Sequence, residues 1–69
     1  MESYKVQYCI EHGKGKADNY TLYVQAFDIV QAFSTACTRI KEIHQIGYFD
    51  LKFYIFCICR EEPVEYLFN

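Results

Sequence analysis

The sequence predicts an α+β fold with the order ββαβ, in which a three-stranded antiparallel sheet carries one amphipathic helix on one face. Three observations predict it. Residues 4–12 and 20–26 alternate apolar and polar side chains, the period of half-buried strands. Over residues 29–44 the apolar spacing changes to three and four, the period of a helix. Residues 51–60 then form a short segment that is apolar at almost every position.

The first two segments predict an antiparallel hairpin. In residues 4–12 the side chains predicted to face the core are Tyr4, Val6, Tyr8 and Ile10. In residues 20–26 they are Tyr20, Leu22, Val24 and Ala26. Residues 13–19 between them contain two glycines and an Asp-Asn pair, which favour a tight turn.

The predicted helix has a recognisable start and end. Asp28 is a good N-cap, and Gln31 stands three positions later, where it completes a capping box. Lys41 and His44 suit the negative C-terminal end, and Gly47 is placed to end the helix. The predicted apolar stripe consists of Ile29, Ala32, Phe33, Ala36, Ile40 and Ile43.

The third strand is predicted to lie at an edge of the sheet. A right-handed crossover through the helix places residues 51–60 beside the first strand and antiparallel to it, so the strand order is 2-1-3. Lys52 and Arg60 are expected on the open face, which is the face of the sheet away from the helix. The side chains of this strand expected to face the helix are therefore Leu51, Phe53, Ile55, Cys57 and Cys59. The open face then receives Tyr54, Phe56 and Ile58.

An apolar patch on the open face is the main functional prediction. A chain of 69 residues has little capacity to cover both faces of such a strand itself. Exposed apolar patches usually mark interaction surfaces. We expect a homodimer. The alternatives are a different protein partner, or coverage by residues 64–68 of the chain's own C-terminal tail, residues 61–69. The predicted interaction residues are Tyr23, Tyr54, Phe56 and Ile58.

Single-stranded nucleic acid is a second candidate ligand for the aromatic sheet face. Bases stack on exposed aromatic rings, here those of Tyr23, Tyr54 and Phe56. The backbone phosphates would then meet Lys5, Lys52 and Arg60. The formal net charge of −2 argues against this function, because such binders rely on a basic surface. No apolar run is long enough to cross a membrane.

The four cysteines are expected to be reduced thiols in a cytoplasmic protein, because residues 1–9 have no apolar export signal. A structural zinc site needs four converging ligands, usually in two short pairs, and this chain has one such pair, Cys57 and Cys59. We therefore expect no metal and no cofactor. A metal or redox site formed by that pair with Cys37 is the alternative.

Catalysis has little support in the sequence. The two histidines lie far apart and have no obvious carboxylate or nucleophile partner. The segment Gly13-Lys14-Gly15-Lys16 lacks the hydroxyl residue and the strand-to-helix context of a phosphate-binding loop. We expect a non-catalytic protein with no catalytic residues.

The layout resembles small ββαβ proteins of phages and other mobile elements. The resemblance rests on the lysine-bearing strand Tyr4-Lys5-Val6-Gln7-Tyr8 and on Val24-Gln25-Ala26-Phe27-Asp28, where a strand ending in a small residue leads to the helix that contains Ala32. It covers most of the chain at the level of pattern. It implies a protein that acts by binding other proteins, and it supplies no site residues.

Overall fold

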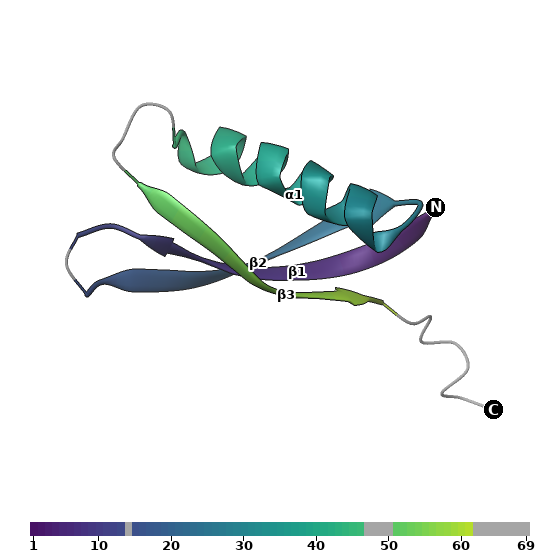
Figure 1. Cartoon of the computed structure of the whole chain (residues 1–69), viewed down its shortest axis with the longest axis horizontal. Helices are drawn as coiled ribbons and strands as arrows, with labels where there is room; N and C mark the ends of the chain where they lie inside the picture. The colour runs from purple at the N-terminus through teal and green to yellow at the C-terminus, as the bar shows by residue number, and fades with distance from the viewer. Residues whose placement is uncertain (14, 47–50, 62–69) are drawn as a thin grey trace.

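A computed structural model describes residues 1–13, 15–46 and 51–61 of the chain. Three strands, β1 (Glu2–Glu11), β2 (Ala17–Ala26) and β3 (Lys52–Arg60), form one antiparallel sheet in the order β2-β1-β3. The helix α1 (Ile29–His44) follows β2 and packs on one face of the sheet (Figure 1). The predicted ββαβ fold and strand order are confirmed. The predicted C-terminal tail beyond residue 61 lies outside the described residues.

The hairpin of β1 and β2 is longer than the alternation predicted. Its register runs without interruption from Glu2 opposite Ala26 to Glu11 opposite Ala17. The ladder thus extends into the polar residues before Tyr20. Main-chain hydrogen bonds do not depend on apolar side chains, so the pairing can continue there. The short loop is closed by a hydrogen bond of 3.0 Å from the His12 amide to the Lys16 carbonyl.

The helix begins at the predicted capping box. The Asp28 carboxylate accepts a hydrogen bond of 2.8 Å from the Gln31 amide, and the Gln31 side chain accepts one of 2.6 Å from the Phe27 amide. At the other end Gln45 adopts the left-handed conformation with φ of 52°, and its amide donates to the Lys41 carbonyl. The cap is therefore at Gln45; Gly47, the predicted stop, lies outside the described residues.

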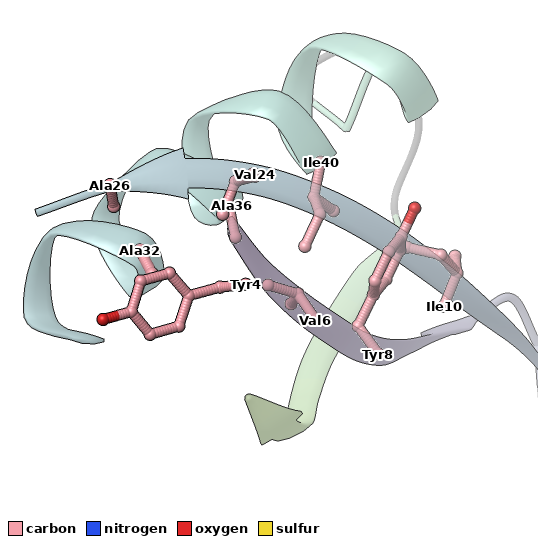
Figure 2. Close-up of a cluster of buried hydrophobic side chains, with 9 residues drawn as sticks. All are labelled: Tyr4, Val6, Tyr8, Ile10, Val24, Ala26, Ala32, Ala36 and Ile40. Carbon is pink, nitrogen blue, oxygen red and sulfur yellow. The ribbon is translucent and has the colours of Figure 1, made fainter. Parts of the chain in front are cut away.

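The core between the helix and the sheet is small (Figure 2). Only Ala32, Ala36 and Ile40 of the helix are buried. The two alanines lie on the line of α1 that faces the sheet, and their small side chains permit a close approach. The sheet contributes the remaining buried residues, which are Tyr4, Val6, Tyr8, Ile10, Val24 and Ala26.

The predicted apolar stripe of the helix is longer than the part of it that is buried. Ile29 is 52% exposed, Phe33 50% and Ile43 50%, although all three share the helical spacing of the buried residues. Ile29 is the first residue of α1 and Ile43 the last but one, so both lie on the line of the buried residues but at the two ends of the helix. Phe33 lies at one margin of that line.

A β-bulge divides β3 and overturns part of the predicted face assignment. Gln7 pairs with Cys57 but Tyr8 pairs with Ile55, so Phe56 is an extra residue on β3. An extra residue shifts the alternation by one, which moves every following side chain to the other face. The bulge lets Ile55 and Ile58, three positions apart, both pack against the core.

Four predicted positions on β3 are therefore wrong. Ile58 pairs with the buried Val6 and packs against the core, so it does not lie on the open face. Arg60 pairs with Tyr4 and likewise lies on the helix side of the sheet. Cys57 and Cys59 pair with Gln7 and Lys5, which places both thiols on the open face. Before the bulge the prediction holds, since the residues that pack against the core are Leu51, Phe53 and Ile55.

Candidate functional site

The exposed aromatic residues of the open face do not form one patch. Tyr23 is opposite Lys5, whereas Tyr54 is opposite Cys9, four residues further along β1. With strand and residue spacings of about 4.8 and 3.4 Å, their Cα atoms are about 17 Å apart. The side chains of Lys5 and Gln7 occupy the central strand between them. The predicted contiguous patch across three strands is therefore divided.

Apolar and sulfur-bearing side chains instead gather along β3. Tyr54 is 50% exposed and Phe56, at the bulge, is 58% exposed. Cys57 and Cys59 follow on the open face. We call these four residues, Tyr54, Phe56, Cys57 and Cys59, the β3 stripe. Of the four predicted interaction residues, two lie in this stripe, Tyr23 lies across the sheet, and Ile58 belongs to the helix side.

The β3 stripe borders a free strand edge. In the described sheet β3 pairs with β1 alone, so its other side presents main-chain donors and acceptors to any approaching chain. Charged residues stand at its two ends, Lys52 and Arg60, and the bulge interrupts it midway. The segment after the bulge, residues 57–60, pairs regularly with β1 and is the part of the edge best formed for a further strand.

Two thiols of the β3 stripe are in contact. The Sγ atoms of Cys57 and Cys59 are 3.4 Å apart, as a hydrogen bond between thiols requires. That hydrogen bond raises the pKa of the Cys59 thiol, with burial a smaller contribution, while Lys5 acts in the opposite direction. The sequence placed this pair against the helix, and only the bulge turns it outward.

The predicted group of Cys37 with Cys57 and Cys59 is not assembled. Cys37 lies on α1, whereas the other two thiols lie on the sheet face that points away from the helix. Among the described residues no three histidine, cysteine or acidic side chains converge as a metal site would require. Cys9 shares the open face but is opposite Tyr54, beyond the bulge from the thiol pair.

A second exposed apolar cluster, at the start of the helix, was not predicted. Phe27 is 70% exposed and Val30 75%, and the half-exposed Ile29 and Phe33 lie beside them. The sequence signal that could have predicted it was the pair Ala32 and Ala36, since small residues mark the line where a helix touches a sheet. The larger apolar residues Val30 and Phe33 then lie to one side of that line.

A third group joins the helix end to the sheet. The hydroxyl of Tyr8 and Nε2 of His44 are 2.8 Å apart and share a hydrogen bond. The Tyr20 ring stacks on Tyr8, with ring centroids 5.5 Å apart, and lies 4.7 Å from the His44 ring. Burial, and then the neighbouring Tyr20, raise the pKa of Tyr8. The group fastens the end of α1 to the hairpin and has no cavity beside it in the described part of the chain.

The positively charged groups proposed for nucleic-acid binding are divided between the two faces. Lys5 and Lys52 lie on the open face with Tyr54, because they alternate with the core-facing residues of their strands. Arg60 lies on the helix side, where it forms an ion pair of 3.7 Å with Glu2. A strand of nucleic acid that stacked on the open face would therefore meet fewer cations than the sequence predicted.

Comparison with protein-family models, with curated proteins and with solved structures finds no match to this chain. Within residues 1–13, 15–46 and 51–61, no helix is long and apolar enough to span a membrane.

Proposed function

We propose that the protein is a small non-catalytic interaction module that works as a homodimer through β3. The observation that carries the proposal is that β3, which in the described part of the chain pairs with β1 alone, also carries the exposed apolar side chains of the β3 stripe. Added strands bind through main-chain hydrogen bonds and side-chain contacts of this kind. The energetic centre is Phe56, with Tyr54 beside it, because buried aromatic anchors dominate most interfaces.

The size of the core supports a second copy as the occupant. Nine residues of the described chain form the buried cluster, and three of them are alanines. A chain this small gains little net stability from its own core. Pairing two β3 strands satisfies the main-chain groups of both edges without requiring any other molecule, and a twofold arrangement closes on itself.

Two further parts of the proposal are the cytoplasmic location, which rests on the cysteines, and the binding of other proteins, which rests on the resemblance. The cysteines at positions 9, 37, 57 and 59 are free thiols, which a reducing compartment such as the cytoplasm preserves. The resemblance to small proteins of phages and mobile elements implies that the dimer binds other proteins. That implication stays a prediction.

Sedimentation of a charge variant tests the proposal. We expect the wild type to sediment as a dimer at micromolar concentration and Phe56→Asp to sediment as a monomer. The substitution removes the aromatic anchor from the interface, so we expect the dissociation constant of the dimer to rise at least about tenfold, or ~1.4 kcal/mol.

Val30→Asp is the matched control, because Val30 is 75% exposed on the helix, away from β3. An acidic residue in the first helical turn is also tolerated. A wild type that remains monomeric at high concentration, or a Phe56→Asp variant that dimerises normally, would contradict the proposal. Titration with a labelled oligonucleotide at low salt tests the alternative function, since phosphate contacts are strongest there.

A further inference from the structure

The Cys57–Cys59 pair has the geometry of half a metal-thiolate site. Zinc–sulfur bonds of about 2.3 Å in a tetrahedron place two sulfur atoms about 3.8 Å apart. The observed separation of 3.4 Å is close to this value, so a small rotation of the side chains suffices to bind one ion. A structural zinc site needs four ligands, and no third metal-binding side chain converges on the pair within the described residues.

The hydrogen-bond ladder defines which backbone groups of β3 face its free edge. The Glu61 amide donates to the Ser3 carbonyl at 2.8 Å, which marks Ser3 and Glu61 as a hydrogen-bonded pair. In an antiparallel ladder such pairs recur at every second residue. Cys59 and Cys57 therefore direct their main-chain groups to β1, and Ile58 directs its N–H and C=O to the free edge.

A twofold axis at Ile58 uses these edge groups. The two copies of Ile58 then form a hydrogen-bonded pair, and Cys57 of each copy stands opposite Cys59 of the other. These flanking positions are non-hydrogen-bonded pairs, in which opposing Cα atoms approach to about 4.5 Å and side chains lie closest. All four thiols project from the same face of the continuous sheet, because opposing residues share a face.

We propose that the two Cys57–Cys59 pairs of a β3–β3 dimer form a tetrathiolate site for one divalent d¹⁰ ion such as Zn²⁺. The inference rests on the proposed homodimer and gives it a specific register. Binding converts four thiols into thiolates, and the four protons pass to solvent. Four thiolates and one divalent cation leave two negative charges. One Lys5 from each copy, opposite Cys59 in the ladder, supplies the two compensating positive charges.

Cadmium titration of the reduced, metal-free protein tests the site. Cd²⁺ binds the same ligands as Zn²⁺, and its thiolate complexes absorb in the ultraviolet. We expect saturation at one Cd²⁺ per two chains, with loss of this absorption in both Cys57→Ser and Cys59→Ser. Cys9→Ser is the matched control and should bind normally, since Cys9 lies on the same face but outside the site. Circular dichroism of each variant verifies folding.

Sedimentation with a chelator separates failure of this inference from failure of the proposed function. A wild-type dimer that binds no Cd²⁺, or binds one ion per chain, overturns the tetrathiolate site and leaves the homodimer standing. A protein that remains monomeric both with Cd²⁺ and with chelator overturns both. A dimer whose dissociation constant falls on addition of Cd²⁺, with one ion per two chains, supports both.

Discussion

The hydrogen bond between Tyr8 and His44 connects residues 36 positions apart and joins the end of the helix to the central strand. Alternation alone identified Tyr8 as a core residue, and it is 3% exposed. Its hydroxyl still needs a polar partner, because an unsatisfied buried hydroxyl costs about 1–3 kcal/mol. His44, one of the basic residues that close the helix, provides that partner through folding of α1 onto the hairpin.

At the scale of this residue we predict a loss of stability in alkaline solution. The pKa of Tyr8 is raised in the folded state above its ordinary value of 10.0, so the folded state holds the phenolic proton more tightly than the unfolded chain. The contribution to the free energy of unfolding is complete below pH 10.0 and is lost as pH rises through the folded-state pKa.

Urea unfolding from neutral to strongly alkaline pH, compared between the wild type and Tyr8→Phe, isolates this effect from other titrating groups. The variant should be less stable by about 1 kcal/mol at neutral pH and should lose less stability on alkalinisation. Parallel curves for the two proteins would show that Tyr8 does not contribute.

At the scale of the element, the helix and β3 each depart from an ideal pattern. The helix has a regular apolar period, but the sheet covers only the middle of the apolar stripe, from Ala32 to Ile40. The bulge in β3 reverses the alternation after Ile55. In both elements the local period identifies the type of structure correctly and does not identify which apolar residues are buried.

Two isoleucines one turn apart on α1 test how much of the helix stripe contributes to the core. Ile40 is fully buried and Ile43 is 50% exposed. Ile40→Ala should cost about 3 kcal/mol, because it removes buried methyl groups and leaves a cavity. Ile43→Ala should cost less than about half as much, measured as the free energy of unfolding in urea. Equal costs would mean that the Ile43 side chain, near the end of the helix, is covered in solution.

At the scale of the whole molecule, apolar side chains remain exposed on both sides of a thin two-layer structure. Tyr54, Cys57 and Cys59 lie on the open face, with the exposed Phe56 at the bulge between them. A second exposed apolar group, at the start of the helix, consists of Phe27, Ile29, Val30 and Phe33. The described chain thus has a core that accommodates only part of its apolar content. The proposed association through β3 would join two sheets into one of six strands, so we expect folding and dimerisation to be coupled.

Coupling of this kind makes thermal stability depend on protein concentration. We expect the wild-type melting temperature, followed by circular dichroism, to rise steadily across a wide dilution series, because dimerisation stabilises the folded state by mass action. Phe56→Asp should melt at one concentration-independent temperature, while Val30→Asp should follow the wild type. A wild-type melting temperature that is constant on dilution would refute the coupling.

Sequence alone determined the elements and their order. Two alternating strands, the Asp28–Gln31 capping box and the right-handed crossover were sufficient for a ββαβ fold with strand order 2-1-3. These features depend on local periodicity and on general rules of chain connection, so they can be read without knowledge of distant contacts. The nearly unbroken apolar run of β3 did not predict which of its side chains face the helix.

Only the tertiary structure decided which side chains of β3 and α1 are exposed. Ile58 packs against the core, and Cys57 and Cys59 face outward. The reason is the extra residue Phe56, which reverses the alternation of β3 between Ile55 and Cys57. A strand that is apolar on both sides accepts either alternation with little change in buried area. Packing against the neighbouring strand and helix selects one of the two alternations, and this packing cannot be predicted from the local sequence pattern.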